Sequence, residues 1–96
     1  MSRTNALRRD ITDFCQKDHE MFYEAWERFK DILLKCPHHG FETWRLVQHF
    51  YNGLNQANRS MIESMNSGRF LNLHETDAYE FLEDLSENSQ QWDYLP

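Results

Sequence analysis

The chain has 96 residues, of which 40% are hydrophobic and 15% aromatic, and its formal net charge is −6. This length suits one domain, near the lower limit for burying a core, so aromatic rings must supply much of the buried area. No apolar run approaches a membrane span and the N-terminus has no signal-peptide pattern, so we expect an intracellular, cytoplasmic protein without a membrane partner. The two cysteines are too few for a disulfide framework, and we expect reduced thiols.

The net negative charge comes from the C-terminal quarter of the chain. Residues 1–36 hold seven basic and seven acidic side chains, and residues 37–74 hold three and two. Residues 75–96 hold seven acidic side chains and no basic one. Proteins grip nucleic acid by neutralising phosphates with clustered Lys and Arg. Because the chain has no such cluster, we expect no direct nucleic-acid binding.

Every candidate segment has the helical period, and none alternates like a strand. Residues 1–5 are expected to be a frayed lead-in to a first helix over about Ala6–Phe14. A polar turn follows at 16–19, with Asp18 as the N-cap of a long second helix. That helix is expected to end at Pro37, because a residue before proline avoids the helical region.

The remaining chain predicts three more helices, over Glu42–Asn52, from the cap Asn55 to about Met65, and over Glu75–Glu87. Gly53 is expected to stop the first of these. Asn72 and Glu75 form a possible capping box at the last. Residues 88–96 are expected to be a flexible tail. The prediction is one all-α domain over 1–96, a compact bundle of about four to five helices.

The second helix carries a continuous apolar stripe with three notable polar residues nearby. The stripe consists of Phe22, Ala25, Trp26, Phe29, Ile32, Leu33 and Cys36. The polar residues are Gln16, Glu20 and Arg28. Glu20 and Arg28 stand two helical turns apart, about 12 Å along the helix axis, so we expect that they do not pair and that each has its own partner. The plainest interpretation is an exposed cap residue and two solvated charges.

The spacing Gln-x3-Glu-x7-Arg-Phe on such a helix resembles the major homology region of retroviral and gypsy-type LTR retrotransposon Gag capsid proteins. The similarity continues through YEAWERFKDILLKCPHHGFETW, FYNGLNQANRSMI, DAYEFLEDL and NSQQW, and covers essentially residues 3–92. The resemblance is to the C-terminal capsid domain, and it implies a fold like that of retroviral capsid C-terminal domains. The SCAN dimerisation domain of zinc-finger transcription factors is a related alternative.

The resemblance implies roles for these polar residues. In the family, the glutamine, glutamate and arginine form a hydrogen-bond network that holds the turn against the helix, which assigns that network to Gln16, Glu20 and Arg28. Lys17 stands where the retroviral pattern usually has glycine, so no glycine-only backbone conformation is required there. This departure favours the retrotransposon proteins over the retroviral ones.

The third predicted helix is the expected association surface. It is apolar on more than one face, and we expect Val47, Tyr51 and Leu54 to belong to the core. Trp and Arg concentrate in interface centres, and the family dimerises through the equivalent helix, so Trp44, Arg45 and Gln48 are the candidate dimer interface.

The implied function is structural: homotypic association in a retrotransposon virus-like particle, with the chain itself and other Gag domains as partners. The alternative is a domesticated Gag or SCAN-like dimerisation adaptor in a cellular protein. Flanking sequence distinguishes the two, because a downstream zinc knuckle and protease indicate Gag, whereas an array of zinc fingers indicates the adaptor.

Metal and catalytic sites have little support in the sequence. Cys36, His38, His39 and His49 suggest zinc, but no second ligand pair stands at a suitable spacing. Neither Cys36 nor Cys15 lies in a catalytic signature. We therefore expect no enzyme activity, no cofactor or metal, and no small-molecule substrate.

Overall fold

The computed structural model describes the backbone of residues 3–93 and the side chains of residues 3–89. Its elements are α1 (Arg3–Thr12), α2 (Phe22–Lys35), α3 (Thr43–Gly53), α4 (Gln56–Met65), the 3-10 helix η1 (Phe70–Asn72) and α5 (Glu75–Asp93). No strand occurs within these residues, so the all-α prediction is confirmed. None of the described helices has the length and apolar character needed to cross a bilayer.

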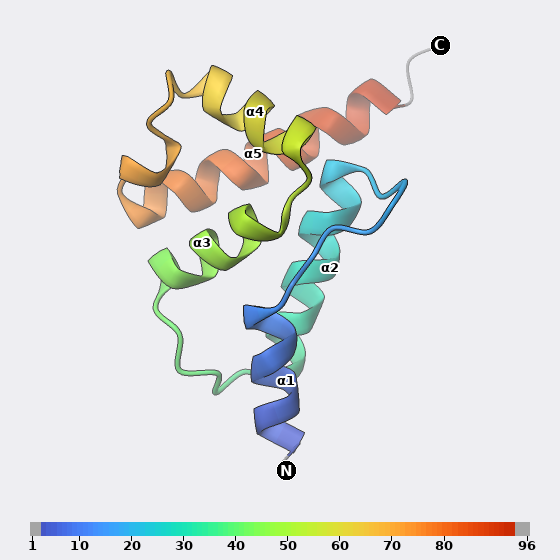
Figure 1. Ribbon diagram of the computed structural model, residues 1–96, viewed down its shortest axis with the longest axis vertical. Coiled ribbons are helices and arrows are strands. Elements are labelled where there is room, and N and C mark those ends of the chain that lie inside the picture. Colours follow the sequence, from blue (N-terminus) through green and yellow to red (C-terminus); the bar gives the residue numbers. More distant parts are fainter. Residues whose placement is uncertain (1–2, 94–96) are drawn as a thin grey trace.

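The helices form an elongated bundle that measures 45 × 31 × 20 Å along its principal axes. The long helix α5 packs against α2 and α3, and α1 packs against the same two helices. In Figure 1, α1 lies at one end of the molecule, and α4 lies toward the opposite end, over the middle of α5 in this view. The bundle therefore has α2 and α3 at its centre, with α1 and α5 packed on them.

Aromatic side chains form the centre of the core, as the composition predicts. Trp26 and Phe29 of α2 and Phe50 of α3 are buried, with at most 1% of each exposed. The Phe50 ring centroid lies 4.8 Å from that of Trp26 and 5.3 Å from that of Phe29. Phe14, which follows α1, packs on Phe29 with the rings edge to face at 5.0 Å. Such aromatic contacts add to the stabilisation from buried area.

The first two helices do not begin where the sequence predicts. Helix α1 already covers Arg3 and ends at Thr12, so Phe14 lies beyond it. Helix α2 begins at Phe22 with Met21 as its N-cap, and Asp18 is not the cap. The reason is a tight turn before α2: the Glu20 N–H donates to the Lys17 carbonyl at 3.1 Å, and His19 has a φ of 66°, which interrupts a right-handed helix. The predicted end of α2 before Pro37 is confirmed.

The remaining helix boundaries agree with the sequence to within about one residue, except at the C-terminal end of α5. Asn55 caps α4 as predicted, since its side chain accepts the Asn58 N–H. The capping box at Asn72 is wrong: Asn72 lies in η1, and His74 Nδ1 accepts the Thr76 N–H at 3.2 Å at the start of α5. At its other end, α5 continues to Asp93, over residues expected to form a flexible tail. Residues 94–96 of that tail lie outside the described residues.

Gly53 is required for a reason that the sequence does not show. It is the last residue of α3 and does not have a positive φ, so it is not a left-handed helix stop. A Cβ at this position would lie 2.1 Å from the carbonyl oxygen of Phe14. The Gly53 carbonyl in turn accepts the Gln16 N–H at 2.8 Å. The loop before α2 therefore crosses the end of α3 at a distance that only glycine permits.

Candidate functional site

Glu20 and Arg28 are directly paired, although helix geometry predicts that they are too far apart. Arg28 Nε donates to Glu20 Oε2 at 2.8 Å, and Arg28 Nη2 donates to Glu20 Oε1 at 2.9 Å. The prediction of separate partners is wrong because Glu20 lies in the turn before α2 and not on the helix. The turn brings the carboxylate back toward the second turn of α2.

The Arg28 guanidinium also holds the end of the first loop. Its Nη2 donates to the Cys15 carbonyl at 2.8 Å, and its central carbon lies 4.4 Å from the centroid of the Phe14 ring. The side chains of Arg28 and Glu20 are 28% and 11% exposed, so the guanidinium is partly and the carboxylate largely removed from water. The guanidinium therefore contacts the loop at Phe14, Cys15 and Glu20, and these contacts together fix the position of the loop.

Gln16 connects the same loop to the junction between α3 and α4. Its amide nitrogen donates to the Glu20 carbonyl at 2.7 Å and to Asn58 Oδ1 at 2.9 Å. Its amide oxygen accepts the Asn55 N–H at 2.9 Å. One half-buried side chain therefore joins two loops that are distant in the sequence. The structure brings Gln16, Glu20 and Arg28 into one hydrogen-bonded network.

The backbone of the turn explains why lysine is tolerated at position 17. Lys17 does not have a positive φ, and its N–H donates to Glu20 Oε1 at 2.9 Å. The left-handed residue of the turn is His19. The Lys17 N–H and the Arg28 guanidinium both donate to the Glu20 carboxylate. The hydrogen bond from Arg28, with a smaller contribution from Lys17, lowers the pKa of Glu20 despite partial burial, which acts in the opposite direction.

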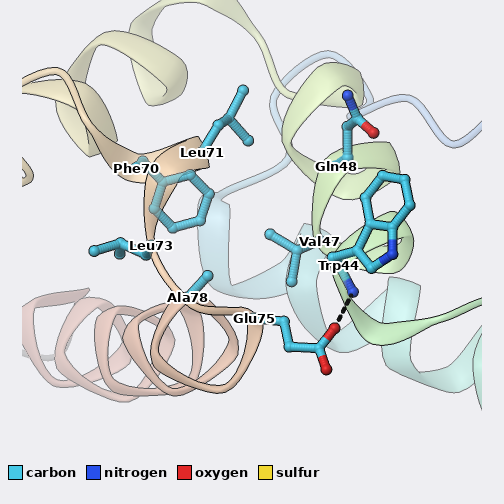
Figure 2. A pocket seen from close by; sticks show the side chains of 8 residues that line it. All are labelled: Trp44, Val47, Gln48, Phe70, Leu71, Leu73, Glu75 and Ala78. Carbon is cyan, nitrogen blue, oxygen red and sulfur yellow. Dashed lines mark hydrogen bonds between the residues drawn. The ribbon is translucent and has the colours of Figure 1, made fainter.

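Trp44 lies at the surface, on one wall of a hollow of about 220 Å³. Its side chain is 48% exposed, unlike those of its helix neighbours Leu46 and Val47, which are buried. Figure 2 shows Trp44 and Gln48 on the α3 side of the hollow, and Phe70 and Leu71 on the opposite side. Trp44 is thus not part of the core, whereas Val47 and Leu54 are buried as predicted.

The far wall of this hollow was not predicted from the sequence. It consists of Phe70, Leu71, Leu73 and Ala78, from η1 and the start of α5. Phe70 is fully buried, while Leu71 and Leu73 are 51% and 36% exposed. The sequence feature that indicates this wall is the apolar segment Phe-Leu-Asn-Leu at residues 70–73, between two predicted helices. A 3-10 turn brings that run onto the surface of the bundle beside α3.

Glu75 fixes the position of Trp44 relative to the far wall. Its Oε2 accepts the backbone N–H of Trp44 at 3.0 Å, drawn as a dashed line in Figure 2. A carboxylate at a helix N-terminus satisfies a free N–H and favours the helix dipole. Glu75 thereby ties the start of α3 to the start of α5. The Trp44 indole N–H donates to the carboxylate of Glu42, which orients the ring.

The other two candidate interface residues are also on the surface. Arg45 and Gln48 are both exposed, and the Arg45 guanidinium carbon lies 5.7 Å from the centroid of the Trp44 ring. An arginine beside an exposed tryptophan is a combination that interface centres favour. The three residues thus share one exposed face of α3.

The described cysteines and histidines do not form a metal site. Cys36 is 3% exposed in the core, whereas Cys15 is exposed. His39 Nδ1 accepts the Phe41 N–H at 2.9 Å, and the rings of both His39 and His49 contact the Phe41 ring. Within residues 3–89, no group of three or more His, Cys, Asp or Glu side chains is arranged to hold a metal ion.

These features define an all-α bundle whose most distinctive parts are a half-buried hydrogen-bond network that fixes a loop and an exposed aromatic face. No protein-family model, no curated protein and no solved structure matches the chain.

Proposed function

We propose that this chain is a capsid C-terminal domain of the gypsy-type Gag kind, and that it functions by symmetric association with copies of itself. The resemblance in sequence motivates the family. The observation that carries the function is the exposed face of α3, where a half-exposed Trp44 stands beside an apolar hollow. An exposed tryptophan next to an apolar hollow is costly to leave in water and is typical of an interface centre.

The position of Trp44 favours a two-fold contact. The projecting ring and the hollow that would receive a partner's ring lie side by side on one face. A surface with both parts is self-complementary, so two copies related by a two-fold axis each supply a ring and a hollow. Such a contact closes with two copies, and many weak contacts of this kind stabilise a larger shell.

The network around Arg28 supports the same proposal indirectly. It involves the residues that the family pattern uses to hold its turn, and it fixes the loop against the end of α3. In this proposal, Gln16, Glu20 and Arg28 maintain the fold, whereas Trp44, Arg45 and Gln48 make the contact. No chemistry at a reacting centre is required.

The test is sedimentation equilibrium over a wide concentration range on the wild type, Trp44→Ala and Leu34→Ala. Leu34 is a matched control, because it is 79% exposed and does not line the Trp44 hollow. We expect the wild type and Leu34→Ala to dimerise equally, and Trp44→Ala to dimerise at least about tenfold more weakly. A wild type that stays monomeric at high concentration contradicts the proposal, as does unchanged dimerisation of Trp44→Ala.

A further inference from the structure

A second apolar groove lies away from Trp44, between the start of α2, α4 and α5. Its volume is about 500 Å³. All three methionines whose side chains the structure describes line it, namely Met21, Met61 and Met65. Met21 and Met65 are 47% and 56% exposed, and Phe22 and Leu85 add buried apolar surface. Methionine is flexible and polarisable, so a groove lined by it adapts its shape to an apolar ligand.

The groove is uncharged inside and has acidic side chains near it. None of its described lining residues is Asp, Glu, His, Lys or Arg. Glu24 stands at the Met21 end, where its Oε1 accepts the Met21 N–H at 2.9 Å. Asp84 is exposed on α5, four residues before the lining residue Asn88 and hence on a neighbouring part of the helix surface. A ligand of this groove therefore meets apolar surface in the middle and negative charge at the side.

We propose that this groove binds an amphipathic helix of a different protein, with bulky aliphatic residues on one face and Lys or Arg along its edges. The residues that the structure describes contain no strand, so there is no sheet edge to which an extended peptide could add. Insertion of a helix into a groove is the mode that a cleft between helices supports. Basic edges match the acidic flank at Glu24 and Asp84.

A second copy of this chain is a poor occupant. Most apolar residues of the described helices already pack against their own domain, including Ile11 of α1, Ile62 of α4 and Leu82 of α5, which are fully buried. The net charge of −6 also makes a second copy a poorer match to an acidic flank than a basic partner is. This docking site is therefore separate from the proposed self-association through Trp44 and does not depend on it.

The binding test uses two labelled helical peptides of about 18 residues, long enough to form a helix in the groove. Both carry leucine along one face; one has lysine along the edges and the other has glutamate. Fluorescence anisotropy is measured with the full chain as the titrant. We expect saturable binding of the lysine peptide and at least about tenfold weaker binding of the glutamate peptide. Absence of saturable binding by the lysine peptide, or equal binding of both, overturns the proposal.

Two variants separate docking in the groove from general attraction to an acidic protein. Met65→Glu places a charge in the groove, and Leu34→Glu places the same charge at an exposed side chain that lines neither this groove nor the Trp44 hollow. We expect Met65→Glu to weaken binding of the lysine peptide at least about tenfold and Leu34→Glu to leave its affinity unchanged. If Met65→Glu binds this basic peptide as well as the wild type does, the attraction is only electrostatic and the groove is not the site.

The same variants distinguish this proposal from the proposed function. Sedimentation equilibrium of Met65→Glu is expected to match that of the wild type, because the groove does not include Trp44. Loss of self-association in Met65→Glu would show that a second copy fills the groove and would overturn the proposed occupant. Thermal melting of both variants checks that each remains folded.

Discussion

Arg28 and Glu20 form a two-pronged ion pair, with hydrogen bonds of 2.8 and 2.9 Å, between a helix and the turn that precedes it. The pair also holds the loop between α1 and α2 in place, because Arg28 donates to the Cys15 carbonyl and Glu20 accepts the Lys17 N–H. It is thus a structural element of the domain and differs from an exposed ion pair on a helix surface, which contributes little.

Replacing Arg28 with alanine is expected to destabilise the fold by about 2–3 kcal/mol, because it leaves the largely buried Glu20 carboxylate without its main partner. Urea unfolding of Arg28→Ala, Glu20→Ala and the double variant measures the coupling between the two side chains. We expect the double variant to be clearly more stable than the sum of the two single effects predicts. Additive effects would mean that the pair does not act as a unit.

Replacing Gln16 with alanine is expected to reduce the free energy of unfolding by about 1–2 kcal/mol, because its amide makes contacts with Glu20, Asn55 and Asn58. Gln48→Ala is the matched control, since Gln48 is exposed on α3. Thermal and urea unfolding at low protein concentration compare the two. Equal free energies of unfolding for the two variants would show that the hydrogen bonds of Gln16 do not stabilise the fold.

Gly53→Ala is expected to cost about 2–3 kcal/mol or more, because its new Cβ would lie 2.1 Å from the Phe14 carbonyl oxygen, a backbone atom that cannot rotate away. The control is Asn52→Ala, at an exposed position of the same helix. Alanine normally favours a helix over glycine, so a purely local effect would stabilise Gly53→Ala. A loss of unfolding free energy therefore indicates the close contact between Gly53 and the loop at Phe14, whereas a gain indicates helix propensity alone.

Acidification is expected to remove the contribution of Glu20 to stability. Its pKa in the folded protein lies below its ordinary value of 4.5, chiefly because of the hydrogen bond from Arg28. The contribution is therefore complete above about pH 4.5 and is lost as the pH falls through the lower, folded pKa. Glu20→Gln lacks this titration. Urea unfolding between pH 7 and pH 3 should show the stability difference between wild type and Glu20→Gln shrinking below pH 4.5; a difference independent of pH would contradict this.

The main difference between sequence and structure lies in the residues before α2. Periodicity placed Glu20 on the helix because apolar spacing shows which residues share a face, but it does not show where the first helical turn begins. The start at Phe22 depends on His19 in a left-handed conformation and on contacts with Gly53 and Asn55, which are distant in sequence. The direct pairing of Glu20 with Arg28 follows from that tertiary arrangement.

The sequence by itself determined the helical class, the aromatic core centred on Trp26 and Phe29, the cap at Asn55 and the end of α2 before Pro37. These features depend on local spacing, capping chemistry and proline sterics, all of which a single segment contains. Only the tertiary structure decided the Arg28–Glu20 pair, the need for glycine at position 53 and the two surface grooves. Each of these depends on how closely separate segments approach one another, and no local pattern encodes that distance.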